Sequence, residues 1–264
     1  MIAVADDFLA ETEALASTIE QAKLPFETAT LFKGWTVTAV LRHLHFWNEA
    51  ARLSLVEPDA FSSLMAEALP MMMQKGLRGV EDERLADLRE DALLDAWRKT
   101  AAHTAAAFRD ADPELRVAWA GPPMSAESSV TARLMETWAH GQAVYDAAGL
   151  ERKDGDRIKA IAELGVRTFG WTYKVRGRDK PSVKPFVRLT APSGAIWMWN
   201  EEREDELIEG DATAFCQVVT QTRNITDTDL RVTGAIAKEW MSIAQCFAGA
   251  AEEPPAPGLR KRAV

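Results

Sequence analysis

The sequence predicts an α+β protein that is mainly helical, and two observations support this class. Apolar residues recur at helical spacing through the first two thirds of the chain, and Pro, Gly and acidic residues mark the loops between these segments. Beyond about residue 180, short extended runs replace this pattern. The predicted helices span residues 3–23, 36–55, 58–75 with an interruption at Pro70, 83–110, 126–148 and 156–174.

The change in periodicity predicts two domains. A helical bundle is expected over residues 1–175, followed by a linker at 176–185, a small α+β domain at 186–250 and a tail at 251–264. In the small domain, "FVRLTAPSGAIWMWN" predicts two short strands around a Pro-Ser-Gly turn, and two later segments each pass from a strand into a helix. The tail is Pro-rich and is expected to be loosely ordered.

Composition excludes several classes of partner. A chain of 264 residues with 47% hydrophobic and 27% charged residues can bury a sizeable core. Its net charge of -9 disfavours nucleic acid and anionic membranes, and its one basic cluster, "LRKRAV", is short and terminal. Because the N-terminus is acidic and no long apolar run occurs, a cytoplasmic location is expected. The isolated Cys216 and Cys246 fit a reducing compartment and predict buried thiols.

One predicted helix carries a pair of possible metal ligands. In "RLMETWAHGQAVYDAAG", Glu136 and His140 stand four residues apart and therefore share a helical face. Ala143 and Ala147 lie on the same strip, so another helix could approach closely. Two interpretations stay open at this point: a surface ion pair, or two ligands of a metal site.

An earlier helix, "GWTVTAVLRHLHFWNEAARL", could supply a third ligand. His43 shares its side with Trp47 and Ala50, a surface expected to be covered, whereas His45 shares its side with more polar residues. His43 is therefore the better candidate. His103 has no second ligand at helical spacing and is interpreted as a packing residue.

The segments "WTVTAVLRHL" and "ETWAHGQAVYD" resemble the metal-binding motifs of the mycothiol-dependent maleylpyruvate isomerases, in the DinB-like four-helix superfamily. The resemblance covers most of the chain, since "APSGAIWMWN", "GDATAFCQVVTQTR" and "VTGAIAKEWMSIAQCFAG" look like the small, sterol-carrier-like α/β domain that accompanies this bundle. It implies an up-down-down-up bundle of helices in which His43, Glu136 and His140 hold one divalent ion.

A set of two histidines and one glutamate suits Zn²⁺, tolerates Ni²⁺, Fe²⁺ or Co²⁺, and leaves a position open for water or a thiol. The resemblance implies that this thiol is an external molecule of low molecular weight, and Cys216 and Cys246 themselves lack metal-ligand spacing. The resemblance thus implies a metal-dependent and thiol-dependent isomerase or transferase. Its substrate would be a small molecule, with unsaturated carboxylic acids among the candidates.

Other functions stay open from the sequence. The same metal could support hydrolysis, or it could be structural in a non-catalytic module whose second domain binds a ligand or forms a homodimer.

Two further residues are candidates for roles in the site. Trp47 lies one turn after His43 and is expected to contact the cofactor from the wall of a cleft between the two domains. Arg223, in "VTQTRNITD", would lie near the domain junction in the family arrangement, so it is the candidate catalytic cation for a carboxylated substrate.

Overall fold

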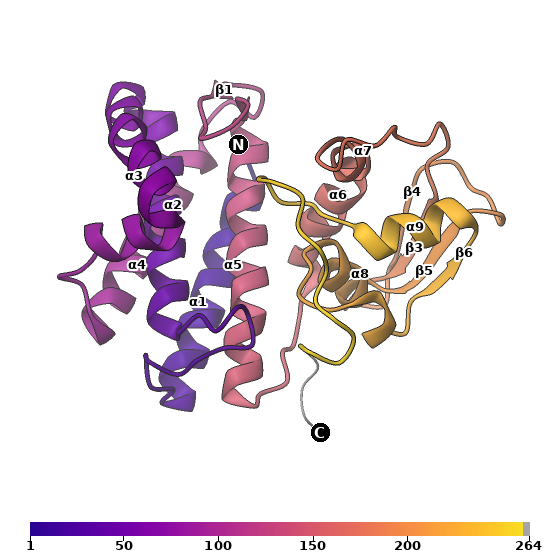
Figure 1. The fold of residues 1–264 in the computed structure, drawn as a ribbon, viewed down its shortest axis with the longest axis horizontal. Coiled ribbons are helices and arrows are strands. Elements are labelled where there is room, and N and C mark those ends of the chain that lie inside the picture. The colour runs from indigo at the N-terminus through magenta and orange to yellow at the C-terminus, as the bar shows by residue number, and fades with distance from the viewer. Residues whose placement is uncertain (261–264) are drawn as a thin grey trace. The chain divides into compact units, whose positions relative to one another are not determined.

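The computed structural model describes residues 1–260, and the chain divides into two compact units, Met1–Leu150 and Glu151–Val264 (Figure 1). The first unit is almost entirely helical and the second combines helices with a four-stranded sheet. The predicted class, a mainly helical α+β protein, is confirmed.

The first unit is a helical bundle. Its helices are α1 (Val4–Ala22), α2 (Val37–Val56), α3 (Pro58–Arg84), α4 (Glu90–Arg109) and α5 (Ala126–Ala148). Helices α1, α2, α4 and α5 pack against one another, whereas α3 packs on α2. Leu15, Leu41, Leu44, Trp97 and Val144 are among the fully buried residues that meet between them. Burial of this apolar surface is the main stabilising contribution to the bundle.

Hydrogen-bonded caps define where α2 and α5 begin. The side chain of Thr36 accepts from the amide of Ala39 at 3.2 Å, and the side chain of Ser125 accepts from the amide of Ser128 at 3.2 Å. Each cap satisfies an amide that has no partner within its helix. At the other end of α5, Gly149 adopts a left-handed conformation with φ of 67°. The two helices that face the candidate site therefore have well-defined ends.

Helix α3 differs from the prediction. It continues through Pro70, where an interruption was expected, and is broken at Gly76, with φ of 74° and ψ of 167°. Proline has a helix-compatible φ, whereas only glycine adopts such a positive φ without strain. The chain resumes as a helix to Arg84, so α4 begins at Glu90 instead of 83. The segment beyond the kink carries Glu81, which proves important for the site.

A short hairpin connects α4 to α5. Strands β1 (Arg116–Val117) and β2 (Met124–Ser125) pair in antiparallel fashion, and the turn between them carries Trp119. The sequence predicted only a loop here.

The second unit contains a sheet with strand order β4-β3-β5-β6. Its strands are β3 (Phe186–Thr190), β4 (Ile196–Trp199), β5 (Leu207–Asp211) and β6 (Arg231–Thr233). Strand β3 pairs antiparallel with β4 and parallel with β5, and β5 pairs antiparallel with β6. The helical segments are η1 (Asp156–Ile158), α6 (Lys159–Arg167), α7 (Phe169–Lys174), α8 (Ala212–Val219), η2 (Ile225–Asp227) and α9 (Ala235–Ile243). The predicted hairpin and both strand-to-helix transitions are present.

The division between the units lies at residue 150, not near 175 as the sequence suggested. Helix α6 packs on α8 of the second unit. A Cβ at Gly165 would lie 2.8 Å from Val219 Cγ2 and 3.1 Å from Phe215 Cε1, so the two helices approach very closely. Helical periodicity identifies a helix but not the domain against which it packs, which explains the difference.

The C-terminal tail is attached to the second unit, contrary to the expectation of loose order. Gln221 Nε2 donates to the carbonyl of Glu252 at 2.9 Å, and Asn224 Nδ2 donates to the carbonyl of Pro255 at 2.8 Å. The proline residues of this segment have no amide hydrogen, and side chains of the unit bind carbonyl groups of the tail. Most of the predicted basic cluster, residues 261–264, lies outside the described residues.

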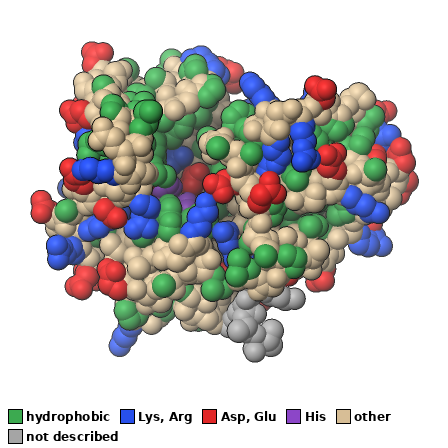
Figure 2. Space-filling model, in the orientation of Figure 1, with side chains coloured by type: hydrophobic (Ala, Val, Ile, Leu, Met, Phe, Trp, Pro, Cys, Tyr) green, Lys and Arg blue, Asp and Glu red, His purple; other side chains and the backbone are tan. Residues whose placement is uncertain are grey.

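The surface and the thiols agree with the composition. Figure 2 shows acidic and basic side chains interspersed over the face in view. Within residues 1–260, no helix combines the length and the apolar character needed to cross a membrane. Among the described residues, Cys216 and Cys246 are buried thiols that form no disulfide, as predicted.

We expect Gly165→Ala to destabilise the second unit. The added methyl group overpacks the α6–α8 contact, which costs about 1 to 3 kcal/mol, more than the gain in helix propensity of up to about 1 kcal/mol. Thermal unfolding followed by circular dichroism measures the change. Gly170→Ala is the matched control, because there the new methyl group meets only the flexible side chain of Lys180. Equal stability of the two variants would contradict the packing described for α6.

Candidate metal centre

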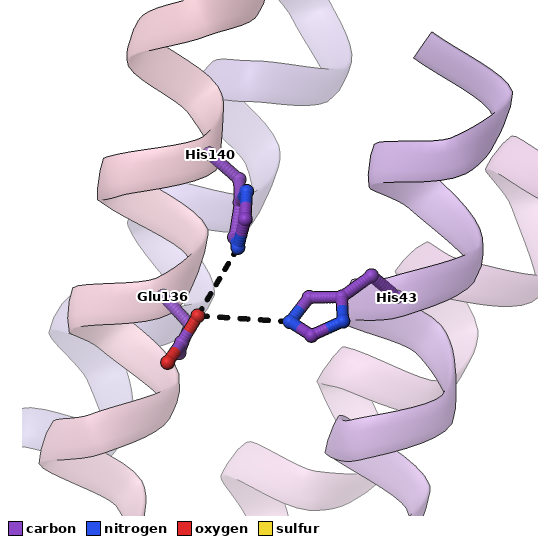
Figure 3. A group of neighbouring side chains, drawn as sticks. All are labelled: His43, Glu136 and His140. Atoms are coloured by element: carbon purple, nitrogen blue, oxygen red, sulfur yellow. Dashed lines mark ion pairs between the residues drawn. The ribbon is translucent and has the colours of Figure 1, made fainter. Parts of the chain in front are cut away.

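Two helices bring His43, Glu136 and His140 together (Figure 3). The Oε2 atom of Glu136 lies 3.7 Å from Nε2 of His43 on α2 and 3.2 Å from Nε2 of His140 on its own helix α5. One ligand atom from each residue lies within 4.8 Å of the other two. The spacing of four residues puts Glu136 and His140 on one face of α5, as predicted from the sequence.

These distances suit a small divalent cation. For metal–ligand bonds of about 2.0 to 2.2 Å, the edge of a coordination tetrahedron measures about 3.3 to 3.6 Å. The two measured separations of 3.2 and 3.7 Å bracket this range. Two imidazoles and one carboxylate are also ligands that Zn²⁺ and neighbouring metals accept. The residues present therefore fit the metal that the sequence predicted.

A fourth residue, Glu81 on α3, holds His43 in place. Its Oε1 atom lies 2.8 Å from Nδ1 of His43 and also accepts a hydrogen bond from Nε1 of Trp47 at 3.0 Å. The Glu81 side chain is fully buried. Because Nδ1 is engaged by a carboxylate, it carries the proton when the ring is neutral, and Nε2 faces Glu136. The sequence does not point to Glu81, since no local pattern pairs it with a histidine 38 positions away.

Aromatic side chains shield the two histidines. Trp35 stacks on the ring of His140, with centroids 5.3 Å apart and planes 4° from parallel, and it lies 5.3 Å from the ring of His43. Phe32 contacts His140 edge to face at 4.9 Å. Both aromatic residues precede α2 and were not predicted as site residues, although the quoted motif begins at Trp35. His43 and His140 are consequently only 7% and 8% exposed.

The other predicted residues have different surroundings. Trp47 is 8% exposed, donates to Glu81 and packs against Trp119 at 5.3 Å, so it supports Glu81 directly. Arg223 belongs to the second unit, is buried, and donates from Nη1 to the carbonyl of Thr222 at 2.9 Å. The roles of Trp47 at a cofactor and of Arg223 in catalysis stay predictions. His45 and His103 lie outside the cluster, as expected.

The electrostatic environment favours a protonated His43 and an ionised Glu136 in the cluster. Burial alone lowers the pKa of His43, but its contacts with the carboxylates of Glu136 and Glu81 outweigh burial and raise the pKa to about 9. Burial lowers the pKa of His140 by more than Glu136 raises it. Burial favours the neutral form of Glu136, yet the two histidines bring its pKa well below the usual value. Without metal, the proton therefore resides on His43 at neutral pH.

The fold and the site define a class: helical-bundle proteins with a His-Glu-His cluster, its histidines buried and its glutamate half-buried, suited to a divalent cation. The family model described as "Mycothiol maleylpyruvate isomerase N-terminal domain" matches residues 6–145, just over half of the chain. The chain belongs to this family, as the sequence motifs suggested.

Several known proteins are similar to this chain. "Uncharacterized protein Rv0036c" of Mycobacterium tuberculosis (strain ATCC 25618 / H37Rv) is 37% identical over 226 residues, covering 85% of this chain and 85% of the relative. "Uncharacterized protein MT0041" of strain CDC 1551 / Oshkosh gives the same values. Among solved structures, the mycothiol-dependent maleylpyruvate isomerase and its histidine-to-alanine mutant match with TM-scores of 0.48 and 0.49, at 19% identity, over 81% of this chain and 88% of theirs.

We expect Glu81→Gln to weaken metal binding about 10- to 100-fold, because the amide no longer fixes the proton of His43 on Nδ1. Competition with a zinc chelator measures the affinity. Glu83→Gln, an exposed change on the same helix, is the matched control and should bind metal normally. Equal affinities of the two variants would show that Glu81 does not orient the ligand.

Metal binding should also depend on pH. Because the pKa of His43 is raised to about 9 in the metal-free protein, a metal ion must displace this proton at any lower pH. Apparent affinity should therefore fall about tenfold per pH unit as the pH decreases from about 9 to about 7, with about one proton released per ion. Chelator competition and calorimetry in buffers of different ionisation enthalpy measure both quantities. An affinity independent of pH in this range would rule out His43 as a protonated ligand.

Proposed function

We propose that the protein is a metal-dependent enzyme of the thiol-dependent isomerase or transferase type. His43, Glu136 and His140 would hold one divalent ion, most simply Zn²⁺, with a position left for a thiol or water. The observation that carries this proposal is the convergence of three ligand atoms within 4.8 Å of one another, with the Glu136 oxygen 3.7 Å and 3.2 Å from the two histidine nitrogens. Membership of the mycothiol maleylpyruvate isomerase family supports the same chemistry.

The number of ligands favours an open position on the ion. Within residues 1–260, the group of neighbouring metal-binding side chains at this point contains three members. Glu81 is the nearest further carboxylate on the His43 side, but it is engaged at Nδ1 and supports the ligand from behind. Structural zinc sites are closed by four protein ligands, whereas catalytic sites have three and an exchangeable position.

The chain's own thiols do not supply the nucleophile in this proposal. Cys216 and Cys246 are buried in the second unit, and burial raises the pKa of the Cys216 thiol well above its usual value. A neutral, enclosed thiol is a poor nucleophile. We therefore assign the thiol to an external molecule of low molecular weight, for which mycothiol is the first candidate because of the family.

The residues around the cluster would prepare it for such a ligand. When bound, a divalent ion would lower the pKa of a coordinated thiol and so supply a thiolate at neutral pH. Glu81 keeps Nε2 of His43 free of a proton once metal displaces it, and Trp35 and Phe32 restrict the rotation of His140 and exclude water from its ring faces. Glu136 supplies negative charge that offsets part of the charge of the ion.

The remaining details extend this proposal. The substrate would be a small molecule, and an unsaturated carboxylic acid fits the family chemistry. The catalytic role of Arg223, the cytoplasmic location and a homodimer stay predictions from the sequence.

Replacing His140 with Ala should abolish stoichiometric metal binding while most of the helical content remains, because the bundle core does not depend on this ring. In the Co²⁺-substituted wild type, addition of a thiol should produce a sulfur-to-metal charge-transfer band. The His140→Ala variant should not show this band, whereas His103→Ala, outside the cluster, should behave like the wild type.

Two results would count against the proposal. Full metal occupancy in His140→Ala would show that the ligands are assigned incorrectly. A Co²⁺ spectrum that does not respond to glutathione, mycothiol, bacillithiol or a simple thiol would favour hydrolysis or a structural metal instead.

A further inference from the structure

A buried arginine lies one turn before Glu136 on α5. Arg133 is 5% exposed, and its Nε and Nη1 atoms have no hydrogen-bond partner within the described part of the chain. Glu136 follows Arg133 by three positions, so both side chains emerge from the same side of the helix. A buried guanidinium with unmet donors is costly to the folded state, which points to a missing partner.

The surroundings of Arg133 connect it to the candidate metal centre. Its guanidinium carbon lies 5.0 Å from the centre of the Trp119 ring. The Trp119 ring in turn lies 5.3 Å from Trp47, whose indole nitrogen donates to Glu81 behind His43. Phe61 stacks on the Trp119 ring at 6.3 Å. The arginine therefore sits in an aromatic environment that is continuous with the residues supporting the cluster.

No carboxylate of the bundle neutralises Arg133 directly. Glu136 interacts with it electrostatically, but the Oε2 atom of Glu136 is directed at the two histidines. Arg42, by contrast, is another largely buried arginine of the bundle and pairs with Asp82 at 3.0 Å. The cation–π contact with Trp119 offsets only part of the desolvation of a guanidinium.

We propose that Arg133 binds a carboxylate group of the substrate used at the His43-Glu136-His140 cluster. This assignment deepens the proposed function and rests on it for the identity of the ligand as substrate. With a divalent ion bound, the ion, Arg133, Glu136 and Glu81 carry a net charge of about +1, which favours an anionic ligand.

Binding of a small unsaturated dicarboxylate to the full-length, metal-free protein tests the proposal without any contribution from a metal. Maleate serves as the probe, and its uncharged diamide, maleamide, is the comparison ligand. Nuclear magnetic resonance of ¹⁵N-labelled arginine follows the Nε–H signal of Arg133, which is identified by its absence in Arg133→Met. We expect this signal to shift on addition of maleate but not of maleamide.

The affinity for maleate should depend on the side chain at position 133. Loss of a charge-assisted hydrogen bond predicts roughly 10- to 100-fold weaker maleate binding in Arg133→Met, and an intermediate loss in Arg133→Lys. Arg109→Met removes an exposed arginine that pairs with Asp6 and should leave maleate binding unchanged. If Arg133→Met does not fold, the Arg133→Lys variant is used to test the proposal. Maleate binding that is at least about threefold weaker than in the wild type supports the proposal, and an unchanged affinity for maleate contradicts it.

An unmoved Nε–H signal, or equal affinity of wild type and Arg133→Met for maleate, would overturn the assignment and leave Arg133 a packing residue for Trp119. Because the protein in this experiment is metal-free, the result is independent of whether the thiol reaches the metal. Failure of the Co²⁺ test together with a positive maleate result would therefore retain Arg133 as an anion-binding residue and reject only the thiol chemistry.

Discussion

The contact between Glu81 and His43 links the packing of the bundle to the geometry of its site. Glu81 lies beyond the kink at Gly76, and its fully buried carboxylate interacts with His43 and Trp47 of α2. A buried carboxylate must be hydrogen-bonded, so the second part of α3 is held where these two partners can reach it. The same contact turns Nε2 of His43 toward α5. One interaction thus fixes a helix segment and a ligand orientation.

Two residues with unpartnered buried polar atoms, Glu81 and Arg133, belong to this region of the bundle. The second carboxylate oxygen of Glu81 and two nitrogens of Arg133 have no hydrogen-bond partner among residues 1–260. Buried polar groups without partners destabilise the folded state. A bound ligand or metal can supply the missing partner, which explains why functional sites retain such groups. The rigid framework around them, with capped helices and stacked aromatic rings, would hold these groups in place before a ligand arrives. Folding energy from the apolar core compensates for the incompletely satisfied site.

Local patterns predicted the helices of the bundle and the shared face of Glu136 and His140, because helical periodicity is a property of neighbouring residues. The resemblance in sequence motifs, not spacing, selected the three ligands. Glu81 was missed because its partner is distant in the sequence and a kink determines its direction. The sequence did not predict the burial of Arg133, because its guanidinium packs on Trp119 from a separate hairpin. Tertiary packing likewise decided that α6 belongs to the second unit.

X-ray absorption spectroscopy of the zinc-loaded protein, before and after addition of a thiol, tests the central claim most directly. The account predicts a first shell of nitrogen and oxygen atoms only, at about 2.0 to 2.1 Å, with outer-shell scattering from two imidazole rings. Addition of the thiol should introduce one sulfur atom at about 2.3 Å without loss of the imidazoles. A shell that contains sulfur before the addition, a number of imidazoles other than two, or four protein ligands that exclude the thiol would contradict an open site held by His43, Glu136 and His140.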